Sequence, residues 1–463
     1  MGRGATVRGR TAAHQPGAAI TAARGGSWNG TGPWWGRRGP RGGRCRRVDG
    51  GCGPYGRGVD TERPLVGLAD VRRAAAALAG ALRPTPAAVS DTLSRLAGRE
   101  VWLKPEHLQR TGSFKVRGAS HHIRALPADG RPVIAASAGN HAQGVALAAT
   151  LAGRRATVLM PTHAALPKVE ATRAYGAEVR LVGSTVDECL AVARAEADAG
   201  GGHFVPPFDD PLVIAGAGTV GLELAAEAPA VETVLVPVGG GGLLAGIAAA
   251  VRALRPDVRI VGVEAGGAAA MRASLDAGRP VTLDRVDTIA DGIALKAPSA
   301  LTLAHVAALV DDVVTVTDEE IGRTLVLLLE RCKAVVEPAG VVGLAALLAG
   351  RVPGTGPALA VLSGGNVDPL LLGKLIEHGL SAAGRFVRLR VVVPDRPGAL
   401  ARITGALAAL GLNVLAVDHH RAGVRVGVDE VEVVFTLETR GPDQRREAVD
   451  ALRRDGLRVD LLA

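Results

Sequence analysis

Short apolar runs alternate with longer Ala- and Leu-rich stretches along most of the chain after about residue 65. The short runs are rich in Val, Ile and Leu, whereas the longer stretches repeat apolar residues at helical spacing. Alternating strands and helices predict an α/β layer fold with a mainly parallel sheet. The predicted strands span residues 132–137, 156–161, 177–183, 233–238, 259–264 and 358–365.

A second and smaller pattern begins after a Gly- and Ala-rich break at residues 379–385. Its elements follow the order β-α-β-β-α-β, which is the order of the ferredoxin-like unit. The sequence therefore predicts two folded domains, one over residues 65–380 and one over residues 385–463. The elements of the second domain are predicted at residues 386–393, 399–411, 413–420, 430–437, about 443–454 and 457–462.

Residues 1–64 differ from both domains in composition. They are rich in Gly and Arg, hold three of the four tryptophans and show no apolar periodicity. Such a segment cannot bury enough apolar surface to offset its chain entropy, so a disordered extension or an over-long start is favoured. An RGG-like arm that binds nucleic acid is the alternative.

The net charge of +9 lies entirely in this extension. Residues 1–64 hold 12 Arg, no Lys and three acidic residues, so the rest of the chain is neutral. A neutral body favours a small-molecule enzyme and argues against a nucleic-acid partner. No apolar run reaches the roughly 18 residues of a membrane span. A cytoplasmic protein without a membrane partner is therefore expected.

The first motif is TGSFKVRGA at residues 111–119, where Lys115 precedes a helix of small residues. Most lysines in such a setting are solvated. The alternative is a Schiff-base lysine, whose amine must be held in place and lose its proton near neutral pH, as partial desolvation allows. Phe114 would supply a flat apolar neighbour, and Ser113 could cap the helix.

The second motif, SAGNHAQG at residues 137–144, forms a turn between a predicted strand and a predicted helix. Small side chains there leave backbone N–H groups open at a helix N-terminus, which suits a carboxylate. Asn140 adds a neutral donor for a phenolic or carbonyl oxygen. An ordinary Asn/Gly turn explains the pattern equally well.

The third motif is a run of four glycines at residues 239–242, between a strand and a helix. Such a backbone can wrap a phosphate at the positive end of a helix. Gly240, Gly242 and Ala245 also fit the Ala variant of the dinucleotide fingerprint, and Glu264 ends the next strand. An NAD-dependent oxidoreductase is therefore the rival hypothesis for this segment.

The fourth motif, SGGN at residues 363–366, closes the last strand of the larger domain. A simple turn would explain it. In the functional interpretation, Ser363 presents a hydroxyl at the carboxyl edge of the sheet, where open α/β sheets bind ligands.

In this order, the four motifs resemble those of pyridoxal-phosphate (PLP) enzymes of the tryptophan-synthase-β type, and within them the threonine dehydratase and serine dehydratase/racemase branch. The resemblance covers residues 65–380 and implies a two-lobed open-sheet fold, PLP fold type II. The DRPGAL segment at residues 395–400 resembles an ACT regulatory domain, so a ferredoxin-like βαββαβ unit that binds an amino-acid effector is expected. The matching segments of the larger domain include GSFKVRGA, SAGNHAQG, PFDD, VGGGGLLAG, DGIALK, VEPAG and SGGN.

The resemblance also implies roles for the matching residues. Lys115 would be the catalytic residue and would hold pyridoxal 5'-phosphate through its amine, with Phe114 against the cofactor ring. Asn140 would bond the ring hydroxyl, and Ser363 would meet the pyridine nitrogen. The phosphate would lie on Gly239, Gly240, Gly241 and Gly242, and the substrate carboxylate on Ser137, Ala138, Gly139, Asn140 and His141.

A serine at the pyridine nitrogen cannot hold a proton there as an aspartate would, so the cofactor would be a weaker electron sink. Elimination suits such a sink, because the departing β-hydroxyl carries the electron pair away. Ala138 stands where racemase-like members of the family carry a serine that can act as a base. Little racemisation is therefore expected.

Two positions depart from the family pattern. Ala217 stands where the family usually has a glutamine, so a side-chain amide is missing. Residues 265–271, after Glu264, lack the further acid that some racemase-like members use for a divalent cation. No metal is predicted, and four cysteines without a CxxC pair indicate neither a zinc site nor a disulfide framework.

The leading hypothesis is a PLP-dependent lyase that converts L-threonine to 2-oxobutanoate and ammonia, and L-serine more weakly. Isoleucine or valine is the expected effector, as for an enzyme of isoleucine biosynthesis, and a homodimer or homotetramer is the expected assembly. An NAD-dependent oxidoreductase, a serine racemase/dehydratase and a non-catalytic amino-acid sensor are the alternatives.

Overall fold

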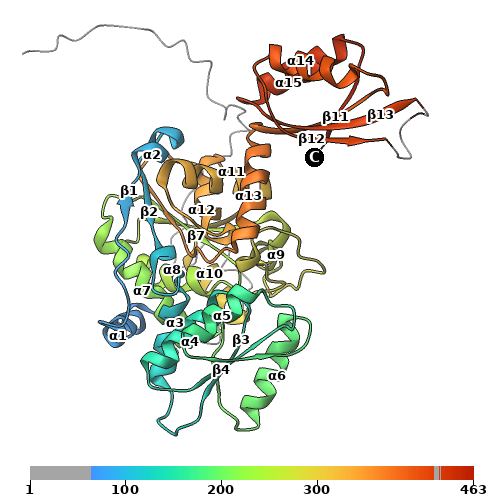
Figure 1. Ribbon diagram of the computed structural model, residues 1–463. Helices are drawn as coiled ribbons and strands as arrows, with labels where there is room; N and C mark the ends of the chain where they lie inside the picture. Colours follow the sequence, from blue (N-terminus) through green and yellow to red (C-terminus); the bar gives the residue numbers. More distant parts are fainter. Residues whose placement is uncertain (1–63, 422–426, 428, 463) are drawn as a thin grey trace, which may run out of the picture. The chain divides into compact units, whose positions relative to one another are not determined.

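The computed structural model describes residues 64–421, 427 and 429–462 (Figure 1). The extension predicted over residues 1–64 lies outside the described residues except for Pro64. The described strands form three sheets, two within residues 64–384 and one after them. Among the described helices, none combines the length and the hydropathy that crossing a bilayer requires.

The larger sheet consists of β1 (Ala88–Val89), β2 (Val101–Lys104), β7 (Thr233–Pro237), β8 (Arg259–Ala265), β9 (Asp312–Val316) and β10 (Ala358–Val361). Its order is β1-β2-β10-β7-β8-β9, and its strands are parallel except for β1 at one edge. Every residue of β7 and β10 is buried, as expected for strands with helices on both faces.

The helices near this sheet are α1 (Leu68–Leu78), α2 (Asp91–Ala97), α7 (Pro211–Glu227), α8 (Gly242–Leu254), α9 (Ala270–Ala277), α10 (Ala300–Leu309), α11 (Asp318–Leu327), α12 (Pro338–Leu348) and α13 (Pro369–Ala382). These helices pack against the sheet through two apolar layers. Leu235 and Val261 pack with α11 and α12, whereas Val234 and Ile260 pack with α7, α8 and α10. Successive strand residues thus face opposite layers.

The smaller sheet consists of β3 (Val133–Ala136), β4 (Ala156–Met160), β5 (Glu178–Leu181) and β6 (His203–Phe204), with α3 (Lys115–Ala125), α4 (Asn140–Leu151), α5 (Leu166–Ala174) and α6 (Val186–Asp198). All its strands are parallel, in the order β5-β4-β3-β6. Val133 and Ala135 pack with α3 and α4, while Ile134 and Ala136 pack with α6.

The loops that follow β3, β7 and β10 carry three of the four sequence motifs. Residues 137–141 follow β3, residues 239–242 follow β7, and residues 363–366 come after β10. In open α/β folds the carboxyl ends of the strands form the ligand-binding edge. The fold therefore gathers segments that are far apart in the sequence.

The C-terminal unit contains β11 (Phe386–Pro394), α14 (Ala399–Ala409), β12 (Asn413–His420), β13 (Glu430–Glu438), α15 (Pro442–Arg454) and β14 (Arg458–Leu462). Its strands form an antiparallel sheet in the order β12-β13-β11-β14. Val387, Leu389, Val391 and Val393 alternate with more exposed residues and are buried in a core of this unit. The chain order confirms the predicted ferredoxin-like topology.

Candidate active site

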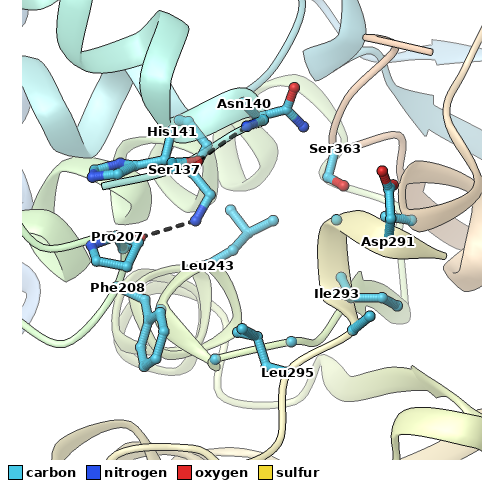
Figure 2. Close-up of a pocket in the computed structure, with 18 of the residues that line it drawn as sticks. Ser137, Asn140, His141, Pro207, Phe208, Leu243, Asp291, Ile293, Leu295 and Ser363 are labelled. Atoms are coloured by element: carbon cyan, nitrogen blue, oxygen red, sulfur yellow. Dashed lines mark hydrogen bonds between the residues drawn. The ribbon is translucent and has the colours of Figure 1, made fainter. Parts of the chain in front are cut away.

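A cavity of about 490 Å³ is lined by the loops after β3, β7 and β10 and by the start of α3. Figure 2 shows Asn140, Ser137 and His141 together on one wall, with Ser363 and Asp291 on the next and Phe208 farther across. Of the predicted site residues, only Gly241 is absent from the wall. The others are Phe114, Lys115, Ser137, Ala138, Gly139, Asn140, His141, Gly239, Gly240, Gly242 and Ser363.

Lys115 is the first residue of α3, and its amine is held at the cavity. Nζ donates a hydrogen bond to Pro207 O at 2.9 Å and lies 5.2 Å from the centroid of the Phe114 ring. Desolvation lowers the pKa of Lys115 to about 8, although the nearby Glu337 carboxyl opposes this effect. An amine with such a pKa can reach both protonation states near neutral pH, as a nucleophile or a base requires.

Arg117 fixes the start of α3, two residues after Lys115. Its guanidinium is buried and donates to Glu106 twice at 2.8 Å, and to Glu223 at 2.6 and 2.9 Å. Glu223 also pairs with the Lys104 amine at 2.7 Å. Because removing one member would leave buried charges without partners, this network holds the helix that carries Lys115.

Ser113 does not cap α3, so that prediction is wrong. The N-cap residue is Phe114, without a side-chain cap, and within the described chain Ser113 Oγ is buried and has no hydrogen-bond partner. Its backbone instead forms a bridge with Gly364, and Phe114 N donates to Ser363 O at 3.1 Å. The residue therefore ties the lysine motif to the loop after β10.

The turn after β3 leads into the N-terminus of α4. Ser137 Oγ accepts a hydrogen bond from Gly139 N at 3.1 Å, and no side chain caps the helix that begins at Asn140. His141 Nε2 is bonded to Val205 O at 2.9 Å, and desolvation lowers the pKa of this imidazole to about 3. The imidazole is neutral, so the helix N-terminus rather than a charge on His141 offers attraction for a carboxylate here.

The glycine loop after β7 leads into α8. Gly241 has a φ of 89°, a left-handed conformation that favours glycine, and an added Cβ would lie 2.7 Å from Met271 Cε. An added Cβ at Gly240 would lie 2.4 Å from the Phe208 ring. Within the described chain, no backbone hydrogen bond uses the N–H of Gly239, Gly240 or Gly241. The loop thus offers free donors at the positive end of a helix.

Ser363 lines the cavity with a largely buried side chain. Its hydroxyl forms no hydrogen bond with any other described residue. A hydroxyl can donate to an aromatic nitrogen, but it is no acid that could keep a proton there. The amine of Lys115, this hydroxyl and the free N–H groups of the glycine loop fit the aldehyde, the ring nitrogen and the phosphate of PLP.

The cavity wall also holds side chains to which no role was given from the sequence, among them Phe208, Asp291, Glu337 and Asn366. Desolvation, and then the charge of Asp291, raise the pKa of Glu337 to about 7. Asp291 also pairs with Lys168 of α5 at 3.2 Å. Each of the four lies in a segment that resembles the family. The sequence therefore indicated these segments, although it gave no reason to assign a role to these side chains.

Glu264, the acid of the rival dinucleotide fingerprint, does not line the cavity. Its buried carboxyl accepts the N–H groups of Met271 and Arg272 at 2.8 and 2.9 Å, and desolvation raises its pKa to about 7. Both carboxylate oxygens of Glu264 accept hydrogen bonds inside the fold, so this side chain cannot bind a ribose. Within the described residues, no group of three His, Cys, Asp or Glu side chains could hold a metal ion.

Residues 78–364 match the family described as pyridoxal-phosphate dependent enzyme, and residues 387–454 match the ACT domain. A Geobacter sulfurreducens protein named L-threonine ammonia-lyase is 45% identical over 384 residues, which cover 82% of this chain and 96% of that protein. Maize serine racemase is 34% identical with a TM-score of 0.64, covering 69% of this chain and 99% of its own. Threonine deaminase isoform 2 from Solanum lycopersicum is 34% identical with a TM-score of 0.63, and the match covers 68% of this chain and 95% of that structure's chain.

The fold and the cavity therefore define a PLP-dependent enzyme with a C-terminal ACT domain. The chain belongs to the pyridoxal-phosphate dependent enzyme family. The predicted cofactor and the predicted fold type II body with an ACT domain are confirmed.

Proposed function

We propose that the enzyme converts L-threonine to 2-oxobutanoate and ammonia, and acts more weakly on L-serine. The identity of 45% to a protein named L-threonine ammonia-lyase supports this activity, as does the similarity to a solved threonine deaminase. One observation carries the proposal. The Lys115 amine, with a pKa lowered to about 8, faces a cavity whose other walls fit PLP.

PLP, when bound, supplies a ring that draws negative charge away from the α-carbon of the substrate. Lys115 is the base for the α-proton, and Pro207 O holds its amine in place at 2.9 Å. The N–H groups at the start of α4 hold the substrate carboxylate and so decide which α-bond faces the amine. The β-hydroxyl and one proton leave together as water, and one water is taken up when ammonia is released, so the overall reaction balances.

Each of the remaining wall residues would contact a different part of the cofactor. Phe114 would lie against its ring, and Asn140 would donate to its ring oxygen. The N–H groups of Gly239, Gly240, Gly241 and Gly242 would bind the phosphate, and Gly241 also shapes the turn through its left-handed conformation. Ser363 would meet the ring nitrogen, and its neutral hydroxyl suits an elimination, in which the departing β-hydroxyl carries the electron pair away from the α-carbon.

The ACT domain supports an amino-acid effector, for which isoleucine or valine of the biosynthetic pathway is proposed. A homodimer or homotetramer is proposed because β12 is an edge strand with Leu415 51% and Val417 40% exposed, and pairing would cover such an edge. We propose the cytoplasm, which holds the free amino-acid pool, as the location, with no nucleic-acid or membrane partner.

The test is a spectrum of the purified protein with PLP, followed by measurement of 2-oxobutanoate after L-threonine is added. A visible absorbance band and keto-acid formation are expected. Lys115→Ala should abolish both, whereas Lys296→Ala, which removes another lysine of the cavity wall, should keep the band. A wild-type protein that stays colourless after incubation with PLP would overturn the proposal.

A further inference from the structure

Glu337 is a buried carboxyl in the cavity wall to which the proposed reaction gives no role. It immediately precedes α12, and its side chain is in direct contact with Asn140 although the two residues lie 197 positions apart. Asn140 Nδ2 donates to Glu337 Oε1 at 2.7 Å. This length is within the range of a full hydrogen bond, which a buried carboxyl needs.

A second residue, Asn366, bonds to the other end of the Asn140 amide. Asn366 Nδ2 donates to Asn140 Oδ1 at 2.8 Å and also to Thr111 O at 2.7 Å. The carbonyl of Thr111 can only accept, so Asn366 turns its Nδ2 toward Thr111 and donates from the same atom to Asn140. The Thr111 carbonyl therefore fixes the direction of these hydrogen bonds, which places Asn140 Oδ1 toward Asn366 and Asn140 Nδ2 toward Glu337.

Gly364 makes room for this arrangement. An added Cβ at Gly364 would lie 2.3 Å from Glu337 Oε1 and 3.0 Å from Asn140 Nδ2. Gly364 O also accepts a hydrogen bond from Glu337 N at 3.0 Å. The backbone thus packs directly against the bond between Glu337 and Asn140 and holds the carboxyl where it is.

The Asn140 amide has two N–H groups, and the bond to Glu337 uses one of them. The other is left as the donor for the cavity, which Asn140 lines. We propose that Glu337 and Asn366 are positioning residues, which clamp the two ends of the Asn140 amide so that its second N–H meets the ring oxygen of PLP. This proposal rests on the proposed function, because that function assigns Asn140 to the ring oxygen.

The charges that face Glu337 come from three elements. Asp291 lies in the turn before α10, Lys168 comes from α5, and Lys115 comes from α3. Lys168 and Asp291 also pair with each other. Because substitution of Glu337 also changes this charge balance, the test must separate the loss of an acceptor from the loss of a charge.

Glu337→Gln keeps a carbonyl oxygen for Asn140 and removes the charge, whereas Glu337→Leu removes both. Each variant is titrated with PLP to measure the dissociation constant, and the absorbance of the bound cofactor is followed against pH. Glu337→Leu should weaken PLP binding about tenfold and shift the midpoint of the absorbance titration. Glu337→Gln should bind within about threefold of wild type. Equal losses in the two variants would show that the charge matters and would overturn the positioning role.

A double-mutant cycle tests whether Glu337 acts through Asn140. In an Asn140→Ala background, Glu337→Leu should change PLP affinity and the absorbance midpoint no more than Glu337→Gln does, because both variants remove the charge and no amide remains to be oriented. Additive effects would overturn the proposal. Should Glu337→Leu fail to fold, Asn366→Ala takes its place in the same cycle, with the same two outcomes.

These readouts separate the inference from the function on which it rests. A wild-type protein that binds no PLP overturns both. A wild-type protein that binds PLP without forming 2-oxobutanoate from threonine removes the proposed substrate and leaves the positioning role to be decided by the cycle. A protein that converts threonine and whose variants behave additively retains the function and loses the positioning role.

Discussion

Burial of one amine sets the chemistry of Lys115. An ordinary lysine has a pKa of 10.5, and desolvation lowers this one to about 8. Only the neutral amine attacks an aldehyde, and its fraction increases as pH rises through that value. The rate at which the apoprotein captures PLP should therefore rise with pH and level off above about 8, as followed by the visible absorbance. A midpoint near 10.5 would contradict the burial argument.

Ala138 is expected to favour elimination over racemisation. It lines the cavity between Ser137 and Gly139, and its methyl group can neither give nor take a proton. Although the fold is similar to maize serine racemase, L-serine incubated with the enzyme should yield no appreciable D-serine by chiral chromatography. Ala138→Ser introduces a hydroxyl at this position, so D-serine formation by this variant is the matched comparison with the wild-type protein. Substantial D-serine from the wild-type protein would refute this assignment.

At the residue scale, the sequence could identify the side chains whose motifs end a strand or begin a helix. Lys115, Asn140 and Ser363 belong to this group. Glu337 and Asn366 could not be given roles, because their chemistry depends on contacts with Asn140, which is distant in the sequence. Such contacts exist only once the strand ends are brought together.

At the element scale, α7 and α8 are packed backbone to backbone. An added Cβ at Gly246 of α8 would lie 2.3 Å from Ile214 O and 2.6 Å from Gly218 N, both in α7. Gly246→Ala should therefore lower the free energy of unfolding by roughly 1–3 kcal/mol, because the added methyl group would force one helix backbone to move. Calorimetry would measure this loss. PLP affinity should fall as well, because α8 begins at the glycine loop.

Gly373 of α13 is the matched control, because an added Cβ there meets no atom within 4 Å. Alanine is the better helix former, so Gly373→Ala should stabilise the protein by roughly 0.5–1 kcal/mol. If both substitutions changed stability equally, propensity rather than packing would explain the effect at Gly246.

The long buried strands could be predicted within a few residues of their ends, because apolar runs between turn residues are a strong signal. The strand predicted at 156–161 is β4 at Ala156–Met160, and that predicted at 233–238 is β7 at Thr233–Pro237. β1 and β6 have two residues each, which is too short to produce a pattern. Sheet order could not be predicted either, because it depends on long-range pairing such as β10 with β2 and β7.

At the scale of the whole molecule, the larger domain and the ACT domain have separate apolar cores. The buried core of the ACT domain is formed by residues between Val387 and Val459, and the cores of the larger domain use residues between Val66 and Leu375. No buried core residue of the described chain belongs to both. Removing one domain therefore opens no cavity in the core of the other.

A chain that ends at residue 384 should for this reason keep its ability to form 2-oxobutanoate from L-threonine. What it should lose is the response to isoleucine or valine, if the ACT domain binds the effector. In the full chain, effector coupling of the usual size would change the threonine concentration at half-maximal rate by roughly 5- to 150-fold. Assays of both chains with each amino acid, and with glycine as a control that lacks an apolar side chain, would measure the difference. A full chain indifferent to isoleucine and valine would remove them as effectors, and a truncated chain that still responds would place the effector site in the larger domain.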